Sequence, residues 1–416
     1  MSLKHCCSRT SETASSSLWS GLILTCLMAL QTLRILANPM QEPAPGRPLL
    51  PPLITLENRT HFFAIPVVGF NTNDRIMAGI ALFNEPKETL PLNFLLLPMW
   101  SFEKNTLMGQ ASTEYTFSFE NALLQTLKPS SSIRKYSLAP SNESYGFISI
   151  ENAINAQLLH GWRWVLAHRY AERDQVVFQM GDFKKIRRSY HFLSFETSYQ
   201  DLFAPNPFSF AAELLHHNKM LRGSFTFNML VPLFDNAEGL HVRVFGGYFL
   251  MRNTQPGADL RFRLQNTSGP RDFAFRHLYV GRLEPPGSLW GNQVYEAGGA
   301  FKYPTPLGQT WHWLASTNLK LDLPVLPLRT FLDIATFHGA GQDISSTQKI
   351  VHVGGVQLHL LHDLLQVNFP VFVSEDLKRI AQLNKLDSYE KTITFTLAFH
   401  RLDAVQSFLN KRWVTK

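Results

Sequence analysis

The stretch Trp311-His312-Trp313-Leu314-Ala315-Ser316-Thr317-Asn318-Leu319-Lys320-Leu321-Asp322-Leu323 alternates between two sets of side chains. One face collects Trp311, Trp313, Ala315, Thr317, Leu319, Leu321 and Leu323, and the other collects His312, Ser316, Asn318, Lys320 and Asp322. A period of two residues predicts a β-strand. Soluble strands average about five or six residues, whereas a tilted strand that crosses a bilayer needs about 9–11. The stretch therefore predicts a membrane-spanning strand, with Lys320 and Asp322 facing water because they would be costly in lipid.

The same alternation recurs along residues 61–402, for example at 106–120, 223–230 and 392–400. Further strands are predicted near 61–70, 74–84, 91–103, 145–158, 173–182, 187–200, 206–217, 239–251, 258–265, 273–281, 293–302, 329–338, 349–360 and 364–373. Residues 121–144, which include a run of serines, and 253–272 are predicted to be longer loops. Single-chain bacterial barrels use an even number of strands. The chain is therefore predicted to be an all-β transmembrane antiparallel β-barrel of about 16 strands, with about 12 as the alternative.

Composition fits a barrel and excludes other classes. Hydrophobic residues make up 45% of the 416 residues, yet the mean hydropathy of −0.08 is not that of a helical membrane protein. Aromatic residues, at 12%, suit the girdles at membrane interfaces and equally suit any all-β core. The net charge is +7, but the basic residues are scattered, so the sequence indicates no nucleic-acid partner.

The N-terminus has the order of a secretory signal. Lys4 and Arg9 precede the apolar run 18–30, and the small residue Ala37 follows. We predict a signal peptide at 1–37, a proline-rich linker at 38–60, an outer-membrane β-barrel at 61–402 and a C-terminal tail at 403–416. An uncleaved anchor and a lipoprotein acylated at Cys26 are the alternatives. All three cysteines lie within the first 26 residues, so cleavage would leave a mature chain without thiols.

Several segments resemble the BamA/TamA superfamily of outer-membrane assembly factors, also called bacterial surface antigens. They look closest to the divergent barrels of Bacteroidota. The resemblance rests on Pro66–Asp74 as the opening hairpin, on Asp272–Arg282 as the entry to a long inward-folded loop, on Trp313–Lys320 and Leu365–Phe372 as late strands, and on Thr392–Leu397 as the closing strand. Two departures stand out: residues 38–60 are too short for a POTRA domain, and the chain does not end on an aromatic residue.

The resemblance implies one motif inside the barrel. In that superfamily an arginine of the long loop folds into the lumen and pairs with an acidic residue on a strand. The nearest match is Gly281-Arg282, with the order altered. Because a buried arginine without a carboxylate would be expensive, Arg282 requires an acidic partner, and Asp322 and Asp333 are both candidates. The other reading makes Arg282 a solvated loop residue.

Signals of catalysis are missing from the sequence. It contains no His-Glu-x-x-His motif, no Gly-x-Ser-x-Gly elbow and no phosphate-binding glycine loop. His216-His217 would point to opposite faces of a strand, and so would His352 and His359 unless a bulge at Gly354-Gly355 shifts the register. We therefore expect no enzymatic activity, no metal site and no cofactor.

The function expected from the resemblance is insertion or translocation of proteins at the outer membrane of a Gram-negative bacterium. A weak seam between the first and last strands would open and template incoming strands. A passive pore or receptor for small solutes is the alternative, and a barrel enzyme ranks behind both. The expected partners are outer-membrane lipids and periplasmic chaperones or other assembly proteins.

Overall fold

The computed structural model describes residues 62–398 except for 72–73, 85–90, 121–122, 138–145, 180–181, 235–237, 253–257, 268–276, 278, 280–283, 285, 324–326, 340–349, 361–362 and 387, with further side chains left out near 62, 70, 71 and 175–185. These residues belong to one compact unit that starts at Phe62. The predicted signal peptide, linker and C-terminal tail lie outside the described residues.

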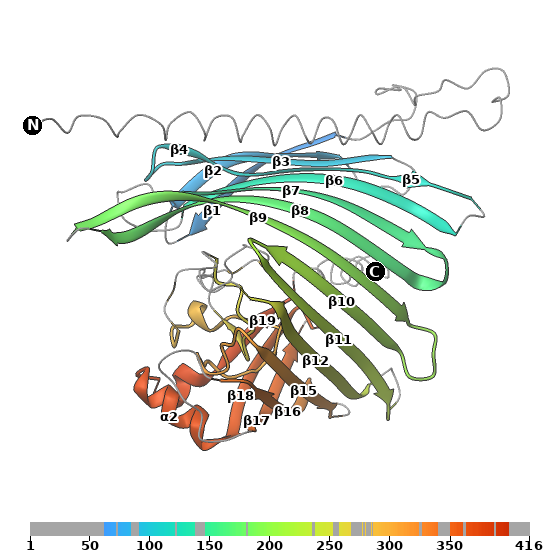
Figure 1. Cartoon of the computed structure of the whole chain (residues 1–416), viewed down its shortest axis with the longest axis vertical. Coiled ribbons are helices and arrows are strands. Elements are labelled where there is room, and N and C mark those ends of the chain that lie inside the picture. Colours follow the sequence, from blue (N-terminus) through green and yellow to red (C-terminus); the bar gives the residue numbers. More distant parts are fainter. Residues whose placement is uncertain are drawn as a thin grey trace, which may run out of the picture. The chain divides into compact units, whose positions relative to one another are not determined.

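Strands dominate the described unit (Figure 1). They are β1 (Phe62–Asn71), β2 (Arg75–Asn84), β3 (Leu92–Ser101), β4 (Thr106–Tyr115), β5 (Phe117–Ser118), β6 (Leu124–Ser137), β7 (Gly146–Leu158), β8 (Trp162–Gln179), β9 (Asp182–Asp201), β10 (Phe208–His217), β11 (Met220–Pro232), β12 (Gly239–Met251), β13 (Asn266–Thr267), β14 (Val294–Tyr295), β15 (Trp313–Asp322), β16 (Leu328–Phe337), β17 (Val351–Leu360), β18 (Leu365–Val373) and β19 (Thr394–Leu397). The α-helix α2 (Glu375–Leu383) and the 3₁₀ turns Leu159–Gly161, Trp290–Asn292 and Tyr389–Thr392 complete the elements.

The large sheet is an antiparallel meander in chain order. Each strand pairs with the next from β1 to β4 and from β5 to β12, and β4 pairs with β6. β12, β15, β16, β17, β18 and β19 continue the series. The sheet counts 17 strands, but β4 and β5 both pair with β6 and so share one position. The result is 16 strand positions, which confirms the predicted all-β antiparallel barrel fold and its strand number.

The two faces of the sheet differ as the alternation predicts. On β15, Leu314, Ser316, Asn318 and Asp322 are buried, while Trp313, Ala315, Thr317, Leu319 and Leu321 are partly exposed. The buried set faces the long connection between β12 and β15, and we call this side the inner face. The opposite, outer face carries exposed apolar side chains on many strands, among them Leu92, Leu96, Trp100, Trp162, Trp164, Leu166, Leu193, Phe195, Leu214, Phe225 and Tyr248.

The connections differ in length between the two ends of the sheet. At the end where β1 turns into β2, which we call the loop end, they include 252–312, 338–350 and 374–393. At the opposite turn end, the longest connection between described strands is 85–91. Among the described residues, no helix is both long and apolar enough to cross a bilayer.

The prediction of a loop at 121–144 was wrong, because β6 occupies most of it. Ser131 donates from Oγ to Asn152 Oδ1 on β7 at 2.9 Å, so the serine run belongs to a ladder. Pro129 lacks the N–H that a ladder needs. It lies opposite the break between β4 and β5, where Thr116 bonds to Pro91 instead.

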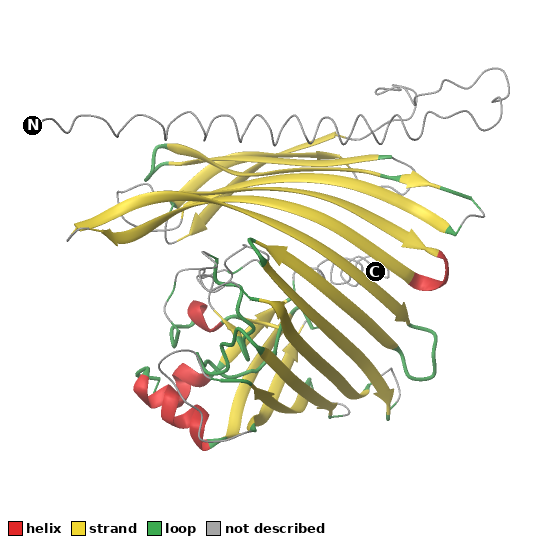
Figure 2. Ribbon diagram, viewed as in Figure 1, coloured by secondary structure: helices red, strands yellow, loops and turns green. Residues whose placement is uncertain are grey.

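The prediction that residues 258–265 and 293–302 form strands of the large sheet was also wrong. Residues 258–265 carry only the bridge Phe262–Thr310, and 293–302 contain only the two-residue β14, which pairs with β13. Most of the strand predicted at 273–281 lies outside the described residues. The described residues of this part of the chain are mostly loops and turns (Figure 2).

Candidate functional site

The connection between β12 and β15, residues 252–312, packs on the inner face; we call it the inner connection. Its buried apolar side chains Leu260, Phe262, Leu264, Phe301 and Leu307 share one core with Phe245, Phe249, Leu314 and Phe331 of the strands. The Phe262 ring lies 5.1 Å from that of Phe249 and 6.0 Å from that of Phe245. A Cβ on Gly247 would come within 2.5 Å of the Phe262 ring, so glycine permits this approach.

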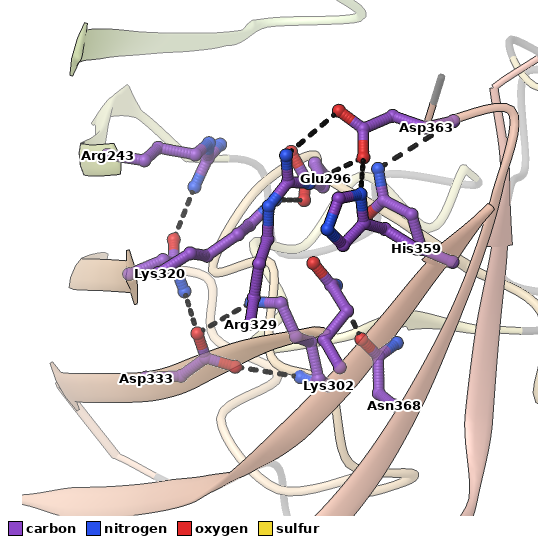
Figure 3. A network of polar contacts seen from close by, with 12 residues as sticks. Arg243, Glu296, Lys302, Lys320, Arg329, Asp333, His359, Asp363 and Asn368 are labelled. Carbon is purple, nitrogen blue, oxygen red and sulfur yellow. Dashed lines mark hydrogen bonds and ion pairs between the residues drawn. The ribbon is translucent and has the colours of Figure 1, made fainter. Parts of the chain in front are cut away.

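Polar residues on neighbouring strands form a belt across the inner face. Arg243 of β12 stands opposite Asn318 of β15, which stands opposite Asp333 of β16. Arg243 Nη1 donates to Asn318 Oδ1 at 2.9 Å, and Asn318 Nδ2 donates to Asp333 Oδ1 at 3.0 Å. We call these three residues the polar belt (Figure 3).

The inner connection is tied to the polar belt by its backbone. Arg243 Nη1 also donates to Gly298 O at 2.9 Å, and Asn318 Nδ2 donates to Gly299 O at 3.0 Å. Buried side-chain donors thus satisfy carbonyl groups of a loop whose described residues mostly lie outside any ladder. The belt therefore positions the connection as well as joining three strands.

An ion pair between Lys302 and Asp333 fixes the connection most firmly. Lys302 Nζ lies 2.9 Å from Asp333 Oδ1, and the Lys302 backbone N–H donates to Asp333 Oδ2 at 3.0 Å. Only 3% of the lysine side chain and none of the aspartate side chain is exposed. Removing one member would leave an uncompensated buried charge, which is strongly destabilising.

A chain of side chains continues from Lys302 to the last strand. Thr394 Oγ1 on β19 donates to Lys302 O at 3.1 Å, and Asn368 Nδ2 on β18 donates to Thr394 Oγ1 at 3.1 Å. Gln357 Nε2 on β17 donates to Asn368 Oδ1 at 2.6 Å. Lys302 therefore connects strands on both sides of the inner connection.

A second ionic cluster lies toward the turn end. Asp322 and Arg329 stand opposite each other on β15 and β16 and form an ion pair. Asp322 Oδ2 also accepts from Gly239 N at 2.8 Å and lies 2.9 Å from His241 Nε2. Arg329 Nη2 donates to Asp363 Oδ2 at 3.2 Å. The carboxylates of Asp322 and Asp363 are thus both paired with Arg329, a cation of β16.

Glu296 adds a carboxylate from the inner connection. It forms an ion pair with Lys320 of β15. Partial removal from water raises the pKa of the Glu296 carboxyl, whose side chain is 40% exposed, but the nearby ammonium groups of Lys320 and Lys302 outweigh this effect and hold that pKa well below its usual range. Glu296 is therefore a carboxylate at neutral pH and serves as a counter-ion.

A cavity of 980 Å³ lies between the inner connection and the inner faces of β9 to β12 and β15. Its lining mixes both signs of charge: the cations Arg222, Arg243, Arg261, Arg263, Lys302, Lys320 and Arg329 face the anions Glu196, Glu213, Asp259, Glu296 and Asp363. Asp259 forms ion pairs with both Arg261 and Arg263. The seven cations exceed the five anions by two, so the lining carries a small positive excess.

The residues singled out from the sequence have different outcomes. Gly281 and Arg282 lie outside the described residues, so their pairing stays a prediction. Of the two acids considered for Arg282, Asp333 binds Lys302 of the inner connection, and Asp322 binds Arg329 of a strand. Lys302 was missed because the sequence places it at the end of a predicted strand, with no local sign of an acidic partner.

The histidines behave as the alternation predicts. His216 is exposed and His217 is buried, on opposite faces at the tip of the β10–β11 hairpin. The bulge beside Gly354-Gly355 exists, but its extra residue is Val371 of β18. His352 is exposed, whereas His359 Nδ1 lies 3.3 Å from Asp363 Oδ1. The described part of the chain holds no group of three histidine, cysteine or acidic residues that could bind a metal ion.

The ends of the meander form the remaining feature of interest. β1 pairs with β2 along all ten of its residues, whereas β19 pairs with β18 over only four. Within the described residues no ladder joins β1 to β18 or β19. We call the place where these two ends would meet in a closed barrel the seam.

No family model matches the chain, and no curated protein matches it either. Among solved structures, the chain is similar to BamA from Haemophilus ducreyi lacking POTRA domains 1-3, with a TM-score of 0.43 and 14% identity over 76% of this chain and 68% of that one. It is also similar to CdiB from Acinetobacter baumannii, with a TM-score of 0.36 and 8% identity over 80% of this chain and 64% of that one, which is less than two thirds of CdiB. The sequence predicts a likeness to the BamA/TamA barrels, and a BamA is among the solved structures that the chain is similar to.

Proposed function

We propose that this protein is a non-enzymatic outer-membrane barrel that helps to insert or translocate proteins by opening its seam. The observation that carries the proposal is the missing ladder between the described parts of the two end strands. Every other junction in the large sheet is a ladder, while the described parts of β1 and β19 share none. A seam with few hydrogen bonds opens at low cost.

An open seam offers a template for another strand. The edge of a sheet presents backbone N–H and C=O groups that can pair with an added strand. β1 is ten residues long and pairs with β2 on one side only. A substrate strand that added to β1 would gain main-chain hydrogen bonds and could then leave sideways into the bilayer.

The outer face supports a place in a membrane. On β3, the outward side chains run from Leu92 to Phe102 and include Phe94, Leu96, Pro98 and Trp100. Ten residue steps cover about 33 Å along a strand at about 3.3 Å per residue. A strand tilt of about 40° reduces this to about 25 Å, the height of the apolar band in outer-membrane barrels.

The lengths of the connections support an outer membrane in particular. Bacterial barrels have short periplasmic turns and longer extracellular loops. The short connections at the turn end and the long ones at the loop end follow this division. The turn end would then face the periplasm, where chaperones or other assembly proteins deliver substrate, and lipids would cover the outer face.

Locking the seam tests the proposal. Cysteines are placed singly along β1 and combined with Thr396→Cys on β19, and a pair that forms a disulfide in the membrane is selected. Oxidation is expected to abolish assembly of other outer-membrane proteins in the source bacterium, and a reductant is expected to restore it. The measurement is the amount of folded barrel proteins in isolated outer membranes.

An ordinary ladder provides the matched control. Ser209→Cys and Asn228→Cys join β10 to β11, where Asn228 Nδ2 already donates to Ser209 Oγ at 3.1 Å. This disulfide is expected to leave assembly unchanged, because the two strands need not separate. Unchanged growth and unchanged outer-membrane composition with a locked seam would reject the proposed function.

The packing of the inner connection on the inner face favours this function over a passive pore. The inner connection packs on β12, β15 and β16, and its residues Lys302 and Glu296 are paired with charges of the strands. We therefore expect the purified protein to show no large, stable conductance in a planar lipid bilayer. A steady conductance of the size of a porin's would instead support a pore.

A further inference from the structure

The free edge of the last strand is in contact with the inner connection. Ala398 N donates to Leu364 O, so the backbone groups of Ala398 face β18. Successive residues of a strand direct their backbone groups to opposite edges, so those of Phe395 face away from β18. There Phe395 forms a parallel bridge with Gln293, next to β14. The edge that would meet β1 thus carries a short segment of the same chain.

Asn292 strengthens this contact with its side chain. Its Nδ2 donates to both Lys391 O and Ile393 O at 2.8 Å, and its Oδ1 accepts from Gly287 N at 2.8 Å. The side chain is 2% exposed, so it makes these bonds away from bulk water. An asparagine amide has two donors and one acceptor oxygen, and all three groups are used here.

Trp290 covers the outward side of the same strand. The alternation along β19 directs Thr394 inward, toward Lys302, and Phe395 outward. Val367, the outward residue opposite Phe395 on β18, is partly exposed, whereas Phe395 is only 8% exposed. The Trp290 ring lies 6.0 Å from the Phe395 ring at 81°, in edge-to-face contact. The segment therefore covers the edge of β19 and shields its outward side.

We infer that residues Trp290–Tyr295, the edge cap, close the last strand against other strands and must leave before β1 or a substrate strand can pair with it. This inference rests on the proposed function, because it adds a regulatory step to the same seam. The partner that displaces the edge cap is an extended polypeptide segment, since only a strand can satisfy the backbone groups along the edge of β19.

The contacts are strong enough to hold and weak enough to be exchanged. The edge cap holds β19 through contacts that include a backbone bridge, the Asn292 side chain and a ring contact. An incoming strand would replace these with main-chain hydrogen bonds at alternate residues of β19, each of modest net value. A closed resting state and an open loaded state are then both accessible.

Cysteine cross-linking tests the resting arrangement without any need for assembly activity. The pair Gln293→Cys and Phe395→Cys reports the edge cap, and Phe395→Cys combined with Ala64→Cys, Val67→Cys or Val68→Cys reports pairing with β1. Cys6, Cys7 and Cys26 are replaced by serine so that no other thiol competes. In isolated membranes we expect the edge-cap pair to form a disulfide much faster than any β1 pair, because the cap must leave before β1 can reach β19.

Loosening the edge cap should shift this balance. Asn292→Ala removes both donations to the carbonyl groups next to β19, so we expect its cross-link rate at the Gln293–Phe395 pair to fall by about five-fold or more. Asn155→Ala on β7, whose Nδ2 bonds Lys128 O, is the matched control and should leave the rate unchanged. Efficient cross-links from β1 to Phe395 in the resting protein, or an unchanged rate in Asn292→Ala, would overturn the inference.

The same disulfide tests the regulatory step. With Gln293 and Phe395 joined, assembly of outer-membrane proteins is expected to stop and to recover with a reductant. Assembly that continues with the edge cap locked would show that the cap need not leave. This result overturns the inference but does not contradict the proposed function of the seam. If the cap cross-links while locking β1 to β19 has no effect, the proposed function falls and the edge cap remains as a structural contact.

Discussion

Replacing Asp333 with alanine is expected to lower the free energy of unfolding by about 3–5 kcal/mol. The substitution leaves the ammonium group of Lys302 buried without its counter-ion, and breaking a buried pair in this way costs about that amount. It also removes the acceptor for Asn318 Nδ2 and for the Lys302 backbone N–H. Urea titration of the protein in detergent or lipid, followed by tryptophan fluorescence, measures the change.

Two variants separate the buried charge from other effects. Lys302→Met in the Asp333→Ala background removes the unpaired charge and is expected to recover most of the lost stability. Glu114→Ala breaks the exposed pair with Lys128 and is expected to cost no more than about 1 kcal/mol. If the double variant were as unstable as Asp333→Ala alone, the ion pair would not be the cause.

Replacing Leu96 with arginine is expected to destabilise the membrane-inserted protein by about 2–4 kcal/mol, because Leu96 lies in the middle of the outward row on β3. The adjacent Leu97 points to the inner face, and Leu97→Arg is the matched control with the same chemical change. Both free energies of unfolding are measured by urea titration in lipid bilayers of the same composition.

The sign of the difference decides between two architectures. In a barrel within a membrane, Leu96→Arg is the worse substitution because an arginine in hydrocarbon is poorly solvated. In a soluble sheet with water outside, Leu96→Arg would be tolerated and Leu97→Arg would be the worse one. Equal effects, or the reverse order, would contradict the membrane placement.

The alternation of residues 311–323 predicted β15 and the orientation of its side chains correctly, since a long strand with two different environments leaves a period of two in the sequence. The same reasoning missed β6, whose serines and Pro129 are typical of a loop. Those residues fit a strand because Ser131 bonds across to Asn152 and because Pro129 meets a break in the neighbouring strand. Both compensations come from other strands and leave no local signal.

The inner connection shows the opposite error. Leu260, Phe262 and Leu264 alternate with Arg261 and Arg263, which is the pattern of a strand. The pattern is real, because the apolar residues pack on the inner face while both arginines bond Asp259 beside the cavity. An extended backbone between two environments thus has the period of a strand without pairing in the large sheet.

The candidate site was predictable only in part. The need of a buried cation for an acid pointed to Asp322 and Asp333 without a choice between them. The structure brings Asp333 to Lys302, a cation of the inner connection other than the predicted Arg282. The choice of Lys302 depends on how residues 252–312 fold back on the sheet, which no spacing in the sequence specifies. Asn292 and Gln293 were likewise hidden, because their partners on and beside β19 lie about a hundred residues away in the chain.

Lys302 holds Asp333 through its ammonium group and accepts from Thr394 through its carbonyl oxygen. A shift of β19 that breaks the bond from Thr394 therefore acts on a residue that also anchors the core of the connection. Thermodynamic linkage makes such coupling reciprocal. A ligand that favours one arrangement of the loops must therefore change the free energy of moving β19. A strand captured at the edge of β19 must in turn change the affinity for that ligand by the same factor.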